Sequence, residues 1–284
     1  MTKRKRNLLG LGAMAAAAAL LLTGCAAGGD GGAAAGPAED CTPAHENLPT
    51  MADGVLKVGI SDMPPLVMPS GPDGYEGLDA DIINGFAEAE CLTVEPVNVG
   101  ATAAVTSVQQ GRVDVSLGGW YRTEARNQEV TMGHPLYLDG LIAAAPQEYS
   151  TFDELEGLNV GVVQGYIFVA DLEARFPGQV KTYPEPTLLA EDLKNGRVDV
   201  AFDVASAALM YDGMEISSLE PDERVEASVL PAQTSFPFQK GKDELVAAFD
   251  AYVQGLHEDG GMVELLEKWE LDPSLADVGE PRFS

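Results

Sequence analysis

The sequence has few basic residues: 17 Lys and Arg stand against 45 Asp and Glu, and the formal net charge is −28 at pH 7. An acidic surface repels the phosphates of nucleic acids and anionic lipid headgroups, so neither is expected as a partner. Histidine is also scarce, because the chain has only His45, His134 and His257. These residues are scattered and the cysteines lack zinc-site spacing. We therefore expect no metal site and no cofactor.

Long hydrophobic runs are lacking too, except near the start of the chain. The basic segment Lys3–Arg6 precedes an Ala-rich apolar stretch, Leu8–Leu22. This stretch is short for a membrane span and typical of a signal peptide, although an uncleaved anchor is the alternative. The next residues, Leu22-Thr23-Gly24-Cys25, resemble the lipobox of bacterial lipoproteins. The resemblance implies a signal peptide over 1–24 and a lipid such as palmitate on Cys25, anchoring the protein to the extracytoplasmic face of the cell membrane.

Two cysteines, Cys41 and Cys91, remain if Cys25 carries the lipid. An even pair in an oxidising compartment predicts a Cys41–Cys91 disulfide, with two free thiols as the alternative. Residues 25–53 are interpreted as the lipidated cysteine and a flexible tether, because a segment rich in Gly, Ala and Pro cannot bury a core. The disulfide would attach this tether to the folded domain.

An internal repeat organises the rest of the chain. Gly111–Val115 and Gly196–Val200 are identical, Gly-Arg-Val-Asp-Val, and a helix-like run precedes each glycine. Glycine typically ends a helix, and the alternating residues after it predict a short strand. A second pair of segments, Leu56–Ile60 and Leu158–Val162, is also similar. The two repeats in the same order predict two similar α/β lobes.

Open α/β sheets bind ligands beyond the carboxyl ends of their strands. The segments that follow the predicted strands are therefore expected to face a ligand: Ser61 and Asp62, Gly118 to Tyr121, Gln164 to Tyr166, and Phe202 with Asp203.

Asp79 and Asp81 lie where the first helix is expected to begin. An Asp is predicted as its N-cap, and acidic residues in a first turn complement the helix dipole. We prefer this interpretation to an acid–base pair.

An ordered set of motifs resembles the polar amino-acid-binding proteins of ABC importers, bacterial solute-binding protein family 3. The motifs are Val58-Gly-Ile, Gly77-Leu-Asp-Ala-Asp-Ile, Gln110-Gly-Arg-Val-Asp, Thr123-Glu-Ala-Arg126, Pro135-Leu-Tyr, Val160-Gly-Val-Val-Gln-Gly and Asn195-Gly-Arg-Val-Asp. The resemblance implies an α/β periplasmic-binding-protein type II fold, two Rossmann-like lobes joined by a two-strand hinge. Lobe one would be 54–143 plus 232–272, lobe two 144–231, and 273–284 a C-terminal tail.

The resemblance also implies the function. The protein would capture an amino acid or related small zwitterion between its lobes and deliver it to an ABC permease, as a monomer and without catalysis. One alternative is an enzyme similar to cyclohexadienyl dehydratases, for which His134 and Glu76 are the candidate general acids. Another is a ligand-sensing lipoprotein that serves a signalling partner.

Arg126 stands at the position of the family arginine that holds the ligand α-carboxylate, and a guanidinium matches two carboxylate oxygens. Without the motif, an ion pair with Glu124 or Glu129 would be preferred. Thr123 is either a ligand contact or a helix cap. Backbone contacts to the ligand are implied for Gly119, Gly165 and Tyr166.

Three departures from the family pattern affect specificity. Tyr121, preceded by Trp120, replaces a small hydroxyl residue. The loop Asp62–Leu66 is shorter than in the family and lacks the common aromatic residue, and Val204 replaces an acidic residue. The carboxylate that would bind the ligand amino group is therefore left open between Asp203, Asp62 and none. The aromatic residues also permit a methylated amine, held by cation–π contact.

Overall fold

The computed structural model describes residues 40–70 and 74–284, and these belong to one compact unit of the chain. The predicted signal peptide, Cys25 and the tether up to residue 39 lie outside the described residues. Across residues 40–70 and 74–284, every helix falls short of the length and apolarity that a bilayer span needs.

The first lobe contains a five-stranded sheet of order β4-β1-β5-β15-β7. β1 runs parallel to β4 and β5, whereas β15 is antiparallel to β5 and β7. Leu56, Val58 and Ile60 of β1 are buried, as expected for a central parallel strand covered on both faces. The strands are β1 (Val55–Ile60), β4 (Thr93–Asn98), β5 (Val115–Ser116), β7 (Thr131–Met132) and β15 (Pro237–Phe238).

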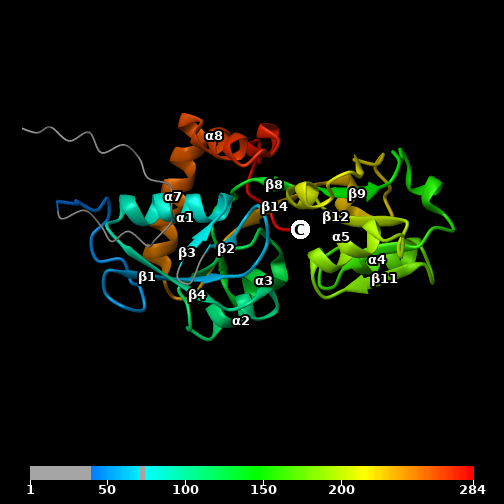
Figure 1. Ribbon diagram of the computed structural model, residues 1–284. Helices are drawn as coiled ribbons and strands as arrows, with labels where there is room; N and C mark the ends of the chain where they lie inside the picture. Colours follow the sequence, from blue (N-terminus) through cyan, green and yellow to red (C-terminus); the bar gives the residue numbers. More distant parts are fainter. Residues whose placement is uncertain (1–39, 71–73) are drawn as a thin grey trace, which may run out of the picture. The chain divides into compact units, whose positions relative to one another are not determined.

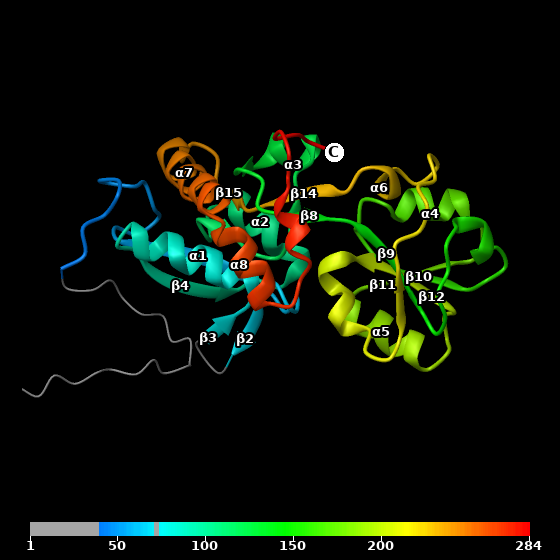
Figure 2. The ribbon, with the colours of Figure 1, turned by 90° about the horizontal axis from the view of Figure 1, so that it is seen from above.

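Helices from both ends of the chain cover this sheet, and α1 and α8 lie side by side (Figures 1 and 2). Phe249 of α7 packs against both α1 and β15, since the centre of its ring lies 5.3 Å from that of Phe86 in α1 and 5.0 Å from that of Phe238 in β15. The helices are α1 (Leu78–Ala89), α2 (Ala104–Gln109), α3 (Glu124–Glu129), α7 (Asp243–Asp259) and α8 (Gly261–Lys268). Shorter elements are β2 (Met68–Ser70), β3 (Gly74–Glu76), and the 3₁₀ turns η1 (Ala101–Ala103) and η4 (Pro273–Ala276).

The second lobe repeats the plan with a sheet of order β11-β10-β12-β9-β13. β10 is parallel to β11 and β12, and β9 is antiparallel to β12 and β13. The strands are β9 (Leu141–Ala145), β10 (Val160–Val163), β11 (Val180–Tyr183), β12 (Val200–Val204) and β13 (Glu215–Ser217). The helices are α4 (Val169–Arg175), α5 (Pro186–Lys194) and α6 (Glu226–Val229), with 3₁₀ turns η2 (Phe152–Leu155) and η3 (Ala205–Met210).

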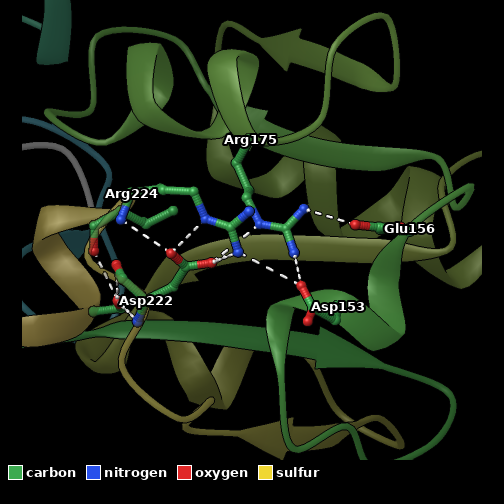
Figure 3. A network of polar contacts seen from close by, with 7 residues as sticks. Asp153, Glu156, Arg175, Asp222 and Arg224 are labelled. Atoms are coloured by element: carbon green, nitrogen blue, oxygen red, sulfur yellow. Dashed lines mark hydrogen bonds and ion pairs between the residues drawn. The ribbon is translucent and has the colours of Figure 1, made fainter.

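An ion network supports one side of the second lobe (Figure 3). The buried Arg175 of α4 pairs with Asp153 and Glu156 near η2 and with Asp222, whose oxygen lies 3.1 Å from Nε. Arg224 contacts the same Asp222 carboxylate at 2.6 Å. The hydrogen bonds from Arg224 hold the pKa of Asp222 well below its ordinary value. The network therefore stabilises the packing of three segments that are distant in sequence.

A short third sheet, β6-β14-β8, connects the lobes. β14 pairs in antiparallel fashion with both neighbours, and the chain leaves β8 for β9 through Gly140 (Figure 1). Its strands are β6 (Trp120–Tyr121), β8 (Leu138–Asp139) and β14 (Ala232–Ser235). The expected lobe boundary at 143/144 falls inside β9, so we propose Gly140 as the first crossing.

The predicted fold and disulfide are confirmed. Gly111 and Gly196 both follow helices with positive φ angles, 65° and 68°, and the repeated Val115 and Val200 begin β5 and β12. The Cys41–Cys91 disulfide joins residues whose Cα atoms are 5.8 Å apart.

The prediction of an Asp N-cap for the first helix is wrong. Gly77 is the N-cap residue of α1 and provides no side-chain cap. Asp79 and Asp81 lie in the first turn, where they still complement the helix dipole. Their carboxylates have other partners, because Asp81 accepts a hydrogen bond from Trp269 Nε1 and Asp79 binds a loop described below.

Candidate ligand-binding site

A cavity of about 490 Å³ lies at the carboxyl ends of the parallel strands of both lobes, as expected for open α/β sheets. Apolar walls with a few polar groups are typical of small-molecule sites. The lining residues that carry polar or aromatic side chains, or glycine backbone, are Thr102, Gly118, Gly119, Trp120, Tyr121, Arg126, Asp139, Gln164, Gly165, Tyr166, Glu185 and Ser206.

The glycine loop after β5 forms one wall. Gly118 and Gly119 have φ angles of 127° and 61°, which glycine adopts without steric strain. Their N–H groups donate to Asp79 Oδ2 at 2.8 and 3.0 Å, and the Tyr137 hydroxyl donates to Oδ1 at 2.8 Å. Burial raises the pKa of Asp79 to about 6, although these hydrogen bonds oppose the rise. Because the Asp79 carboxylate accepts hydrogen bonds from both glycine N–H groups, it fixes the position of the loop.

Arg126 follows this wall in α3 and has the features of an anion-binding residue. Thr123 is the N-cap, and its Oγ1 accepts a hydrogen bond from Arg126 N at 3.2 Å. The guanidinium donates to Tyr121 O at 2.7 Å and lies 5.4 Å from the Trp120 ring. Among residues 40–70 and 74–284, no carboxylate pairs with it, neither Glu124 nor Glu129. Burial lowers its pKa, but an arginine remains charged.

Arg122 has a structural role. It is buried and donates from Nε to Gly133 O at 3.0 Å and from Nη1 to Arg282 O at 2.7 Å. Its guanidinium also lies 4.5 Å from the centre of the Phe283 ring. These contacts join β6 to the C-terminal tail and leave Arg126 as the arginine that faces the cavity.

Gly165 and Tyr166 form the facing wall in lobe two. The Tyr166 hydroxyl donates to Asp203 Oδ1 at 3.0 Å, and Tyr211 donates to Oδ2 at 2.5 Å. Val204 N donates to Oδ1 as well, at 2.8 Å. Asp203 is fully buried behind the wall, so its carboxylate orients Tyr166.

Asp139 is a buried cavity residue that the sequence analysis missed, as it missed Glu185 and Ser206. It is only 2% exposed, and its oxygens accept from Ser206 N at 3.0 Å and Ser206 Oγ at 2.9 Å. Burial raises its pKa to about 7. A signal existed, because Asp139 is the one charged residue between Pro135 and Pro146.

The structure places six of the sequence-predicted ligand residues on the cavity: Arg126, Tyr121, Gly119, Trp120, Gly165 and Tyr166. Thr123 caps α3, and Asp203 lies behind the wall. Asp62 is exposed and lines a neighbouring hollow of about 290 Å³. The candidate general acids Glu76 and His134 do not line the cavity. In the described part of the chain, no cluster of three or more potential metal ligands occurs.

Comparisons with known proteins agree with this geometry. The L-cystine-binding protein TcyJ of Escherichia coli is 24% identical over 227 residues, which cover 76% of this chain and 82% of that protein. The substrate-binding protein of an amino acid ABC transporter has a TM-score of 0.65 at 24% identity, covering 76% of this chain and 99% of the other.

A third similar structure is an ancestral amino-acid-binding protein, AncCDT-1, described as a precursor of cyclohexadienyl dehydratase. It has a TM-score of 0.66 at 21% identity, and the match covers 76% of this chain and 95% of the other. At this identity the solved structures establish the fold. The sequence model of one protein family, the bacterial extracellular solute-binding proteins, family 3, matches residues 56–272, so the chain belongs to that family.

Proposed function

We propose that this protein binds an amino acid in the cavity and delivers it to an ABC permease. The observation that carries the proposal is Arg126, which faces the cavity without a carboxylate partner among the described residues. A half-buried guanidinium has lost part of its hydration and gains most from a bidentate anion. The amino-acid-binding relatives agree with a carboxylate ligand.

In the proposed complex, Arg126 holds the α-carboxylate and the glycine loop lets the ligand approach the backbone closely. Tyr166 and Gly165 contact the ligand from lobe two. Ligand that touches both lobes favours a closed arrangement over an open one, and a permease would recognise that closed form.

The site of action follows from the family and from the start of the chain. We propose that the mature protein works outside the cytoplasm as a monomer, held by a lipid on Cys25. This residue lies outside the described part of the structure, so the proposal depends on the sequence motif. Radiolabelled palmitate incorporation into wild-type protein and its absence in Cys25→Ala would test it.

We infer that this cavity binds its ligand rather than converting it. A dehydratase needs a general acid beside the leaving group of its substrate. The cavity holds two carboxyl groups that could donate a proton: Glu185, which is solvent-exposed, and Asp139, whose pKa burial raises to about 7. Both candidates from the sequence lie elsewhere, and the binding-protein relatives favour transport over a dehydratase. No observation favours a sensor over a transport protein.

Arg126 provides the direct test of the binding proposal. Calorimetric titration with the twenty common L-amino acids is expected to give saturable binding of at least one. Arg126→Ala should weaken that binding by about 100-fold, because a charged bidentate contact contributes about 3 kcal/mol. Arg126→Lys should recover only part, since a lysine cannot form the bidentate contact. Unchanged affinity in Arg126→Ala would contradict the carboxylate clamp.

A further inference from the structure

Three buried carboxylates cluster around the cavity, and their hydrogen bonds differ. Asp79 accepts three bonds and Asp203 accepts three, and neither lines the cavity. Asp139 does line it, and within residues 40–70 and 74–284 its hydrogen bonds come from Ser206 alone. A carboxylate offers about four acceptor positions, so Asp139 keeps about two for a ligand. No Lys or Arg among the described residues pairs with it.

Tyr121 provides an independent observation at the same place. Its hydroxyl is buried and has no hydrogen-bond partner among the described residues, and the residue is only 7% exposed. A buried hydroxyl without a partner is unfavourable by about 1–3 kcal/mol. Because Tyr121 lines the cavity, a ligand is the natural partner.

Tyr121 also connects the two charged ends of the site. Its carbonyl oxygen accepts from Arg126 at 2.7 Å, whereas its hydroxyl lies in the electrostatic field of Asp139 and Asp203. A ligand with an anionic group at Arg126 and a cationic group at Asp139 would therefore extend along Tyr121. This arrangement matches a zwitterion.

We propose that Asp139 and Tyr121 form the subsite for the positively charged nitrogen of the ligand, an inference that rests on the proposed function of the cavity. A primary ammonium donates hydrogen bonds to an Asp139 oxygen and to the Tyr121 hydroxyl oxygen. The subsite lies at the crossing between β8 and β9, so ligand charge acts directly on the segment that joins the lobes. It replaces Asp203 and Asp62 as the carboxylate for the amino group.

Proton linkage gives this subsite a distinct signature. Burial raises the pKa of Asp139 to about 7, with smaller contributions from Asp203 and Asp79. The other titratable groups that face it are the hydroxyls of Tyr121, Tyr137 and Tyr166, which stay protonated at neutral pH. A bound cation stabilises the ionised carboxylate and lowers its pKa. Ligand affinity should therefore rise between pH 6 and pH 8, with proton release near pH 7.

The test is calorimetric titration of the full chain with the twenty common L-amino acids, L-cystine and glycine betaine. Asp139→Asn keeps the shape and an acceptor for Ser206 N, and it should weaken binding by about 10- to 100-fold. It should also abolish the pH dependence. Tyr121→Phe should weaken binding by about threefold to tenfold. Asp250→Asn is the matched control, because Asp250 is a partly buried carboxylate outside the cavity lining.

A desamino analogue separates a ligand contact from a structural role. For the amino acid that binds, wild type should strongly prefer it to the matching desamino acid, and Asp139→Asn should lose most of that preference. Thermal unfolding of each variant reports whether it folds.

If Asp139→Asn and Tyr121→Phe bind as wild type does while Arg126→Ala does not, the subsite is wrong and the proposed function stands. If glycine betaine alone binds and requires Asp139, the subsite stands and the amino-acid function fails. If no compound binds, both fail.

Discussion

At the scale of single residues, the site depends on backbone conformations that side chains disfavour. Gly119 has a φ of 61°, and a Cβ atom there would lie 2.6 Å from Leu66 Cδ1. Its N–H is also one of the donors to Asp79. The glycine is therefore needed for conformation, for space and for the position of the loop amide.

Gly119→Ala should reduce both stability and ligand affinity. Alanine at positive φ costs about 1–2 kcal/mol, and displacement of the loop adds to this. Gly213→Ala is the control, because Gly213 has a φ of 80° and open space around it. Urea unfolding should show a loss in both variants, with binding reduced only in Gly119→Ala. Equal binding by the two variants would contradict the role given to the loop.

The residues that the sequence predicted and those that it missed differ in a physical way. Arg126, Gly165 and Tyr166 follow strands or motifs with local signals, and they line the cavity. Asp139 and Asp79 act through contacts distant in sequence: Ser206 lies 67 residues from Asp139, and Gly118 lies 39 residues from Asp79. No local pattern encodes such contacts, so their roles required the structure.

At the scale of elements, the same distinction holds. The repeated strands β5 and β12 follow glycine-terminated helices and could be predicted. The sheet β6-β14-β8 could not, because its strands are two to four residues long and pair across about a hundred residues. The lobe boundary expected at 143/144 therefore differs from the end of this sheet, because it falls inside β9.

The C-terminal tail is the element that supports this sheet. Gln233 of β14 is buried, and its Nε2 donates to Val278 O and Glu280 O, both at 2.8 Å. Arg282 N donates back to Gln233 Oε1 at 2.8 Å, and Ser284 N donates to Arg122 O at 2.9 Å. The tail thus satisfies polar groups beside β14, the strand to which the chain returns after α6.

Deleting residues 277–284 should destabilise the protein by about 2–5 kcal/mol, because the buried Gln233 amide and Arg122 lose partners. Hydrogen exchange should increase at the β14 amides more than in β10. A milder variant, Arg282→Lys, should fall between wild type and the deletion. An unchanged urea midpoint in the deletion would show that the tail does not support β14.

At the scale of the whole molecule, the buried carboxylates govern how stability depends on pH. Burial raises the pKa of Asp79 to about 6 and that of Asp139 to about 7. From about pH 4 upward, the unfolded chain releases these protons while the folded protein keeps them. The folded state then binds more protons, so the free energy of unfolding decreases as the pH rises from about 4 to about 7. Asp222 has the opposite effect: its pKa is lowered, so its contribution to stability is lost as the pH falls below about 4.

Ligand-free protein should therefore be most stable near pH 4–5, and each raised carboxyl should account for about 2–4 kcal/mol of the decrease toward neutral pH. The net charge of −28 acts in the same direction through self-repulsion, so wild type alone cannot separate the two causes. Asp139→Asn removes one buried carboxyl and changes the net charge by a single unit, as Asp212→Asn does at a solvent-exposed site. Urea unfolding at pH 4.5, 6 and 7.5 should show a flatter profile for Asp139→Asn, which becomes more stable than wild type at pH 7.5, and a nearly parallel profile for Asp212→Asn. If the two variants behave alike, net charge explains the decrease and Asp139 is ionised without penalty. If Asp139→Asn is more stable yet fails to bind ligand, the buried Asp139 carboxylate destabilises the ligand-free protein and is needed for binding a cation.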